Sequence, residues 1–226
     1  MRMKKSRMYS SIKCTWSPVV GCSHNCIYCW AARQAKRQKH RCRLCYDFIP
    51  HLHEDRLRKV PKAGMVFVVD MGDLFCEAVT SKWICKVIEA MKTNRNATFF
   101  LETKNPQRYF KFLDELPQNV ILSTTIETNR RTDYVSKAPP PFCRYLAMKT
   151  LGWPRKHVSI EPIMDFDLAT LVGWMKEINP ELVSVGYDNY KHYLPEPSLH
   201  KTLQLIQELE KFTKVERKTI RNAWEK

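Results

Sequence analysis

Met65-Val-Phe-Val-Val69 is a run of five apolar residues that ends at an acid, Asp70. An apolar run without polar alternation is typical of a strand buried on both faces of a parallel sheet. The segment from Ser81 to Met91 follows it and carries its apolar residues at helical spacing. Together the two segments predict a strand and a covering helix, which form the repeating unit of an α/β fold.

The same alternation continues along the chain in both directions. Further strands are expected at Ile12–Trp16, Thr98–Leu101, Val120–Ile126, His157–Ile160 and Leu182–Val185, and further helices at Pro106–Leu113, Phe142–Leu151, Leu168–Ile178 and Leu199–Leu209. About six β/α units imply parallel strands joined by right-handed crossovers. They are compatible with an open doubly wound sheet or with a partial barrel.

Acidic residues stand shortly after most of the expected strands. They are Asp70 and Asp73, Glu102, Glu127, Glu161 and Asp188. Each alone is equally well explained as a helix cap or a loop residue, but the carboxyl ends of the strands build the active site of β/α barrels. Their recurrence favours the α/β class with a partial (β/α)6 TIM-like barrel of parallel strands. We expect residues 1–62 and 63–226 to belong to one domain.

Basic residues are concentrated near the N-terminal end. Residues 1–62 carry 15 Lys and Arg residues against 3 Asp and Glu residues, whereas residues 63–200 carry 16 of each. Such a block usually binds a polyanion, most often nucleic acid, and the alternative is a solvated basic face. Aromatic residues lie among the basic ones and would allow an exposed base to stack. They are Trp16, Tyr28, Trp30, Tyr46 and Phe48.

Composition disfavours several other classes of protein. Only six glycines are present and no Gly-rich phosphate-loop motif occurs, so that mode of nucleotide binding is not expected. The longest uncharged run, residues 14–32, is interrupted by proline and polar residues, so no membrane partner is expected. No signal peptide is apparent, and the cysteine count is nine. An odd number of thiols without an export signal indicates a cytoplasmic protein that uses cysteines as metal ligands.

Cys22-Ser-His-Asn-Cys26-Ile-Tyr-Cys29 is a C-x3-C-x2-C triplet. Three thiolates on one loop can hold three irons of a cubane cluster and leave the fourth iron open to a small molecule. The alternative is a zinc ribbon, because a second pair, Cys42-x2-Cys45, follows Cys29 after twelve residues. The ribbon leaves Cys22 unexplained, and the cluster leaves the second pair unexplained.

The second pair has its own alternatives. His40, His51 and His53 lie nearby in the sequence, so Cys42 and Cys45 would suit an auxiliary zinc or cluster site. Two free thiols on a helix are the other interpretation.

The triplet, with Tyr28 before its last cysteine, resembles the signature of the radical S-adenosylmethionine (SAM) superfamily. Further segments are similar to a radical-SAM-like family first named from phage genes. These segments are Thr15-Trp-Ser-Pro-Val-Val-Gly-Cys22, Val69-Asp-Met-Gly-Asp-Leu-Phe75, Glu102-Thr-Lys-Asn-Pro-Gln-Arg108 and Ser159-Ile-Glu-Pro162. The triplet spacing is shorter than that family's commoner pattern, and the basic segment 33–45 is an insertion relative to it.

The resemblance implies a partial β/α barrel in which Cys22, Cys26 and Cys29 hold a 4Fe-4S cluster and SAM chelates its open iron. An electron donor such as a flavodoxin or ferredoxin would drive cleavage of SAM to a 5′-deoxyadenosyl radical. Tyr28 carries over as a neighbour of the adenine. The other implied cofactor-binding residues are Asp70 and Asp73 toward the methionine amino group, Ser123, Thr125 and Glu127 toward the ribose, and Glu161 toward either.

The basic block makes nucleic acid, as RNA or DNA that is modified or repaired, the first expected substrate. The alternative enzyme acts on a small nucleoside-like or phosphorylated metabolite. Outside enzymes, the alternative is a non-catalytic, zinc-ribbon-type nucleic-acid-binding protein.

Overall fold

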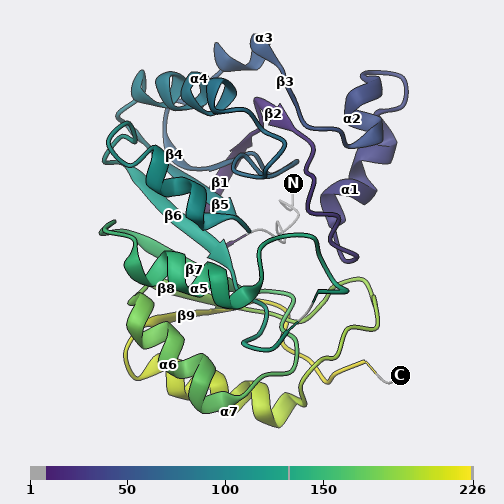
Figure 1. The fold of residues 1–226 in the computed structure, drawn as a ribbon, viewed down its shortest axis with the longest axis vertical. Coiled ribbons are helices and arrows are strands. Elements are labelled where there is room, and N and C mark those ends of the chain that lie inside the picture. Colours follow the sequence, from purple (N-terminus) through teal and green to yellow (C-terminus); the bar gives the residue numbers. More distant parts are fainter. Residues whose placement is uncertain (1–8, 132, 225–226) are drawn as a thin grey trace, which may run out of the picture.

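The computed structural model describes residues 9–131 and 133–224. Seven parallel strands curl into a half-barrel, which confirms the predicted α/β class and partial barrel (Figure 1). In spatial order the strands are β1 (Ile12–Trp16), β4 (Gly64–Val68), β5 (Ala97–Thr103), β6 (Val120–Thr125), β7 (Lys156–Ile160), β8 (Leu182–Val185) and β9 (Lys214–Arg217).

Four longer helices cover the outer face of this sheet (Figure 1). They are α4 (Ser81–Lys92), α5 (Pro141–Thr150), α6 (Leu168–Ile178) and α7 (Leu199–Glu210). Each turns an apolar stripe toward the sheet, as Ile84, Val87 and Ile88 do in α4, where all three are fully buried. The Thr80 side chain caps the start of α4 by accepting the Trp83 N–H, so the sequence fixes the start of this helix locally.

Two elements differ from the expectation. The sheet contains a seventh strand, β9, whose Lys-Val-Glu-Arg sequence gives little apolar signal because it lies at the sheet edge and stays partly exposed. The segment expected as a helix at 106–113 is the 3-10 helix η2 (Pro106–Lys111). Its Tyr109 is drawn inward, and the hydroxyl donates to the carbonyls of Leu101 (2.9 Å) and Ser123 (2.8 Å).

The inner face of the half-barrel is layered along the strands. Phe67, Phe100 and Ile121 are neighbours on β4, β5 and β6 and pack with Tyr9 in a small apolar cluster. Side chains two residues further along a strand share the same face, so the next layer on β5 and β6 consists of Glu102 and Ser123. The inner face therefore changes from apolar to polar toward the carboxyl ends of the strands.

The chain between β1 and β4 forms an insert whose α1–α2 part stands apart from the four outer helices, while α3 lies beside α4 (Figure 1). It contains β2 (Val19–Val20), α1 (Trp30–Ala35), η1 (Lys36–Gln38), α2 (Arg43–Asp47), β3 (His51–Leu52) and α3 (Glu54–Leu57). β2 and β3 pair antiparallel, which returns the insert to the start of the cysteine loop.

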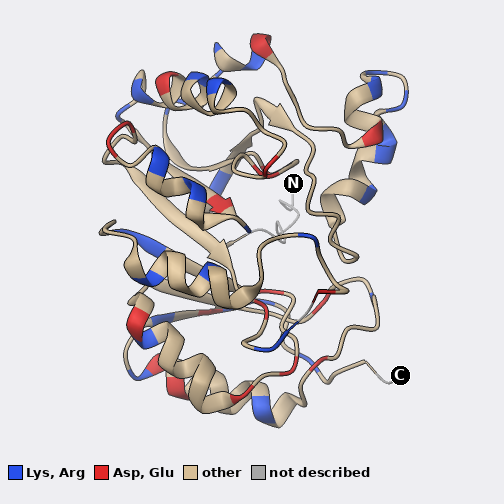
Figure 2. Cartoon of the chain, in the orientation of Figure 1, with Lys and Arg blue, Asp and Glu red and all other residues tan. Residues whose placement is uncertain are grey.

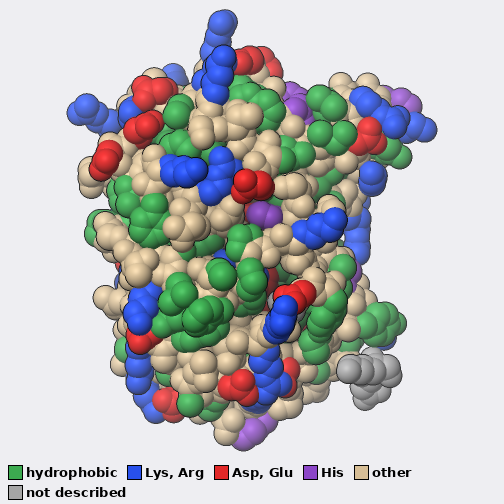
Figure 3. All heavy atoms as spheres, viewed as in Figure 1, with side chains coloured by type: hydrophobic (Ala, Val, Ile, Leu, Met, Phe, Trp, Pro, Cys, Tyr) green, Lys and Arg blue, Asp and Glu red, His purple; other side chains and the backbone are tan. Residues whose placement is uncertain are grey.

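Charge is distributed unevenly over these elements. Lys and Arg dominate the α1–α2 part of the insert in Figure 2, while acidic residues gather in loops at the open side of the sheet. The face drawn in Figure 3 mixes both signs. Among the described residues most of the basic excess therefore lies in the insert, and a smaller part lies after residue 200. The first eight residues of the basic block lie outside the described residues. No described helix is long and apolar enough to cross a membrane.

Candidate functional site

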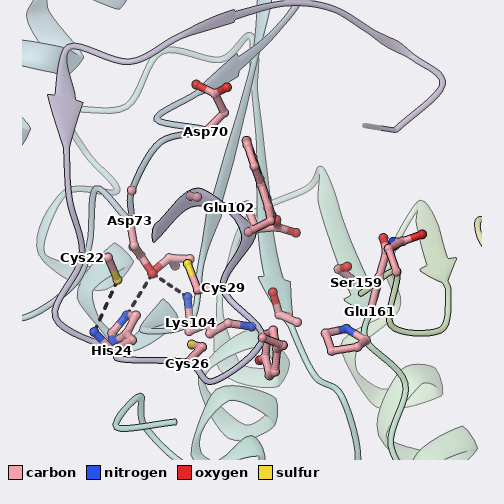
Figure 4. Close-up of a pocket in the computed structure, with 18 of the residues that line it drawn as sticks. Cys22, His24, Cys26, Cys29, Asp70, Asp73, Glu102, Lys104, Ser159 and Glu161 are labelled. Atoms are coloured by element: carbon pink, nitrogen blue, oxygen red, sulfur yellow. Dashed lines mark hydrogen bonds and ion pairs between the residues drawn. The ribbon is translucent and has the colours of Figure 1, made fainter. Parts of the chain in front are cut away.

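A cavity of about 500 Å³ opens at the carboxyl ends of the strands. All three cysteines of the triplet line it, and Figure 4 shows them on one side of it, with Glu102 and Glu161 across from them. The other acidic lining residues are Asp70, Asp73 and Asp188. Five of the six predicted strand-end acids therefore contribute to one polar mouth, and Glu127 lies behind it.

The triplet lies on the loop between β2 and α1. The Sγ of Cys22 accepts the N–H of His24 (3.4 Å), and the Sγ of Cys29 accepts the N–H of Ala32 at the start of α1 (3.3 Å). The loop turns at Asn25, which adopts a left-handed conformation with φ 49°. The loop thus presents sulfurs that already receive backbone hydrogen bonds.

The three sulfurs do not converge on one point. Among the described residues, the groups whose ligand atoms all lie within 4.8 Å of one another include Cys22 with His24 and Asp73, but not Cys22 with Cys26 and Cys29. A single zinc ion requires ligand atoms within about 4 Å of one another. The spacing of the triplet therefore suits a multi-atom centre better than one ion.

Two thiols of this loop, those of Cys22 and Cys29, have raised pKa values. A hydrogen bond with Cys76 and burial raise the pKa of Cys22, and burial raises the pKa of Cys29. A cation bound to these sulfurs would displace the protons, so metal binding here releases protons. Cys76 is fully buried beside Cys22, a contact that the sequence pattern did not predict.

His24 and Asp73 tie the cysteine loop to the sheet. The Nε2 of His24 lies 2.9 Å from Oδ2 of Asp73. Asp73 also accepts the Thr103 hydroxyl (2.7 Å) and the backbone N–H groups of Lys104 and Phe75 (2.9 Å each). Burial opposes its charge, but His24 and these donors outweigh burial and lower the pKa of Asp73. Most of the hydrogen-bond acceptor capacity of the Asp73 carboxylate is thus taken up by these groups of the chain itself.

Asp70 is placed differently from Asp73. It lines the cavity, is half-buried, and accepts a hydrogen bond from the Ser17 hydroxyl. A carboxylate accepts several hydrogen bonds, so Asp70 keeps acceptor capacity toward the cavity.

Tyr28 and Glu127 form a buried charged cluster next to the triplet. The Tyr28 hydroxyl donates to Glu127, which is also paired with Lys104 (2.7 Å) and Arg144 (2.8 Å). Burial opposes ionisation of Glu127, but Arg144 and Lys104 outweigh it and lower its pKa to about 2. Glu127 therefore anchors Tyr28 and Lys104, and both of these line the cavity.

The two hydroxyl residues of β6 have different environments. Thr125 lines the cavity. Ser123 lies one layer deeper, is fully buried, and contacts Glu102 (3.2 Å) and His157 Nδ1 (2.7 Å). Only Thr125 is thus presented to a bound molecule directly.

Glu102 and Glu161 are the acids on the far side of the cavity. Glu102 accepts the hydroxyl of Tyr9 (2.6 Å), and burial raises its pKa. Burial also raises the pKa of Glu161 to about 7, although Lys218 works in the opposite direction. Asn189 donates to Glu161 at 3.3 Å. Glu161 is therefore a group that changes charge near neutral pH.

The cavity rim carries aromatic and basic side chains. Trp30 and Tyr190 both line the cavity and remain 41% and 42% exposed. Arg33 stacks over the Tyr190 ring at 4.7 Å and contacts His192 Nε2 at 2.8 Å. The start of the basic insert thus lies at the mouth of the cavity.

Cys42 and Cys45 lie outside the cavity. They group with His51 and His53, all four ligand atoms lying within 4.8 Å of one another. Cys26 and Cys29 belong to no such group among the described residues, so the four cysteines of the predicted zinc ribbon do not converge. His40, the third histidine near this pair in the sequence, is exposed and does not belong to this group.

Several of the cavity residues described above were missed by the sequence reasoning, among them His24, Lys104 and Tyr9. His24 lies inside the triplet, and Lys104 lies two residues after the strand-end acid Glu102, so position alone was the available signal. Tyr9 lies in the basic N-terminal segment and has no motif around it.

Comparison with solved structures reveals the same fold in other proteins. A spore photoproduct lyase mutant with bound AdoMet and dinucleoside spore photoproduct has a TM-score of 0.59 and 12% identity, over 92% of this chain and 65% of that chain. Streptococcus suis SuiB bound to S-adenosylmethionine has a TM-score of 0.56 and 11% identity, over 92% of this chain and 51% of that chain. Both are radical SAM enzymes. The chain thus spans about two thirds or less of their lengths, and the likeness is one of fold.

Sequence comparison gives the family. No curated protein matches the chain. Residues 9–174 match a family model that bears no phage-derived name and is described as "Protein of unknown function (DUF5131)". Because this match covers most of the half-barrel and the whole cysteine loop, the chain belongs to the DUF5131 family.

Proposed function

We propose that the protein is a radical SAM enzyme whose 4Fe-4S cluster is held by Cys22, Cys26 and Cys29. The observation that carries the proposal is the position of these thiols, which stand apart from one another on one loop at the wall of a cavity of about 500 Å³. Backbone N–H groups already donate to two of the sulfurs, as hydrogen bonds to sulfur do in iron–sulfur sites. The similarity of the fold to spore photoproduct lyase and SuiB supports this assignment.

With SAM bound and the cluster reduced by a donor such as a flavodoxin or ferredoxin, the two together would supply a 5′-deoxyadenosyl radical that abstracts hydrogen from the substrate. The chain's own residues would bind and orient SAM. Tyr28 and Thr125 line the cavity beside the triplet and suit adenine and ribose contacts. Asp70 retains acceptor capacity for an ammonium group, whereas the oxygens of Asp73 already serve His24 and Thr103.

Two charged groups complete this assignment. Glu127 holds Tyr28 and Lys104 in place from behind the cavity wall. Glu161 faces the cavity from the opposite side, where its carboxyl would meet SAM or the substrate.

For the substrate, we propose an exposed nucleotide of RNA or DNA. Trp30 and Tyr190 offer partly exposed rings at the cavity mouth, and a cationic side chain, Arg33, lies over one of them. Aromatic rings beside basic residues are the usual means of holding an unstacked base and its phosphates. The basic block of residues 1–62 would supply the phosphate contacts, and a small nucleoside-like or phosphorylated metabolite is the alternative substrate.

Anaerobic iron and sulfide analysis tests the cofactor. We expect about four irons and four sulfides per reconstituted chain, lost on Cys22→Ala, Cys26→Ala or Cys29→Ala and kept in Cys143→Ser, whose thiol is exposed and remote in sequence. Reduced, loaded protein should form 5′-deoxyadenosine from SAM.

Zinc without sulfide in the wild-type protein, unchanged by Cys22→Ala, would contradict the radical SAM assignment. It would leave a metal-binding nucleic-acid-binding protein.

A further inference from the structure

A second set of metal-ligating side chains lies in the insert, outside the cavity. The Sγ atoms of Cys42 and Cys45 and one ring nitrogen each of His51 and His53 all lie within 4.8 Å of one another. We call these four residues the Cys2His2 cluster. The cysteines come from the start of α2, and the histidines from β3 and the residue that follows it.

The distances inside this cluster match one tetrahedral ion. The Nε2 of His51 lies 3.5 Å from the sulfurs of both Cys42 and Cys45, and the Nε2 of His53 lies 3.2 Å from Cys45 Sγ. Zinc bonds of about 2.3 Å to sulfur and about 2.0 Å to nitrogen, at tetrahedral angles, separate sulfur and nitrogen ligands by about 3.5 Å. An ion at the centre would thus reach all four atoms with small side-chain movements.

Surrounding contacts orient the ligands. The Nδ1 of His51 lies 2.7 Å from the carbonyl oxygen of Ile49, which only accepts, so Nδ1 carries the proton and Nε2 presents its lone pair. The N–H of Cys45 donates to the Sγ of Cys42 at 3.4 Å. These are the outer contacts that keep a histidine and a thiolate aimed at a metal.

The donor set selects the metal and its role. Two thiolates and two imidazoles at tetrahedral spacing favour zinc over oxygen-preferring or octahedral ions. Four protein ligands leave no position open for water or substrate, so the site is structural rather than catalytic.

The cluster is joined directly to the triplet loop. His51 pairs with Val20 across the β2–β3 ladder, and the N–H of Cys22 donates to the carbonyl of Phe48 at 3.3 Å. Between them, Gly21 packs so closely on the insert that a Cβ there would lie 2.6 Å from the backbone nitrogen of Pro50. Segment 48–52 therefore forms one wall of the turn that leads into the first cysteine.

We propose that Cys42, Cys45, His51 and His53 bind one structural zinc ion, which holds the insert against residues 19–22 and thereby positions Cys22. The inference does not depend on the proposed function, because zinc binding at this site requires no iron at the triplet.

Metal analysis of the full-length protein tests the site. We expect one zinc per chain after desalting, or uptake of one added Zn²⁺ in competition with a chromophoric chelator. Replacement by Co²⁺ should give the intense visible bands of a tetrahedral cobalt ion with thiolate ligands, a measurement that needs no variant. No Zn²⁺ uptake by the wild-type protein, or a Cys42–Cys45 disulfide in its place, would overturn the proposal.

Variants assign the ligands. Cys42→Ser and His53→Ala should each lower the affinity for Zn²⁺, measured in competition with the chelator, at least about tenfold, since loss of a ligand's supporting contact alone has an effect of that size. His40→Ala and Cys143→Ser change exposed residues of the same types outside the cluster and should keep full zinc. Circular dichroism verifies that each variant folds. An unchanged affinity for Zn²⁺ in Cys42→Ser or in His53→Ala would contradict the assignment.

Two further readouts separate this site from the triplet and test its role. Cys26→Ala should lose iron and keep zinc. Loss of zinc in that variant would instead support a zinc-ribbon site that includes Cys26 and Cys29. In His53→Ala, amide hydrogen exchange of residues 19–22 should become at least about tenfold faster. Unchanged exchange there would show that the ion does not position Cys22.

Discussion

At the scale of the single residue, Glu161 is a buried carboxyl group whose charge changes with pH in the neutral range. Burial raises its folded-state pKa to about 7, from 4.5 for an exposed glutamate. Below about pH 4.5 the residue is protonated in both the folded and the unfolded state and does not lower the free energy of unfolding. As the pH rises from there to about 7, the unfolded state ionises first, so stability falls by up to about 3 kcal/mol.

Glu161→Gln removes this pH-dependent cost, since glutamine stays neutral. We expect the variant to be more stable than the wild type at pH 8 and to differ little at pH 4.5, as measured by urea unfolding at both values. A stability difference that is constant over this range would show that Glu161 does not titrate near neutrality.

Arg144 stabilises the charged form of a buried carboxylate, Glu127, in contrast to the environment of Glu161, which disfavours the charged form. It is 2% exposed, pairs with Glu127 at 2.8 Å and also donates to the carbonyls of Thr125 (2.6 Å) and Pro139 (2.8 Å). Arg144→Met would leave Glu127 buried with only Lys104 as a charged partner. Removing one member of a buried pair costs about 3–5 kcal/mol, and urea unfolding should reveal a loss of that size.

The surface pair of Arg155 with Glu181, at 3.3 Å, provides the control. Arg155→Met should cost no more than about 1 kcal/mol. Equal losses in the two variants would mean that the Arg144–Glu127 pair has no special weight in the fold.

Residues that carry a spacing pattern were predictable, and residues placed only by the fold were not. The three thiols of the triplet follow from C-x3-C-x2-C, and all of them reach the cavity. Tyr9 is separated by 93 residues from Glu102, the carboxylate that it contacts, and no local pattern encodes that pairing. The sequence placed three histidines near Cys42 and Cys45, but only the β2–β3 pairing shows which two face the thiols.

At the scale of elements, the strands were predictable where burial makes them apolar. The predicted bounds of β1 and β8 agree with the structure, and those of β4 to β7 differ by one or two residues at their ends. β9 was missed because an edge strand with alternating charged residues carries no apolar run. Apart from the helix considered around Cys42 and Cys45, the elements of the insert were not predicted, since two-residue strands and helices of three to six residues are too short to show a period.

The contact between the insert and the triplet loop yields a prediction at this scale. Gly21 has φ 98°, a conformation that side chains rarely adopt, and its Cα faces the backbone of Ile49 and Pro50. Gly21→Ala should push β3 away from β2 and displace Cys22, so we expect a loss of iron on reconstitution together with lower stability.

Gly173, in the middle of α6, is the matched control because a Cβ there would meet nothing within 4 Å. Gly173→Ala should be neutral or stabilise the protein by about 0.5–1 kcal/mol, the helix preference of alanine over glycine. Normal iron content in Gly21→Ala would show that the triplet tolerates movement of the insert.

At the scale of the whole molecule, most of the net charge of +15 comes from residues 1–62. Residues 63–200 carry balanced charges, and the described part of the basic block is centred on the insert, whose first helix borders the cavity. A nucleic acid drawn to this region would meet the exposed rings of Trp30 and Tyr190 at the mouth. The basic insert thus adjoins the mouth of the cavity, which supports the proposed nucleic-acid substrate.

This arrangement predicts how binding responds to salt. For single-stranded nucleic acid the logarithm of affinity falls with the logarithm of salt concentration by about 0.7 for each phosphate contact. Arg37, Lys39 and Arg41 are exposed on the insert, and changing all three to Gln should reduce that slope by about 2, as measured with a labelled oligonucleotide at several salt concentrations. Changing Lys82, Lys92 and Arg95, which are exposed on α4 and just after it, removes the same charge from the outer face and should leave the slope unchanged. Equal effects of the two triple variants would mean that affinity follows net charge alone. A wild-type affinity independent of salt would exclude a nucleic-acid substrate and favour a small metabolite.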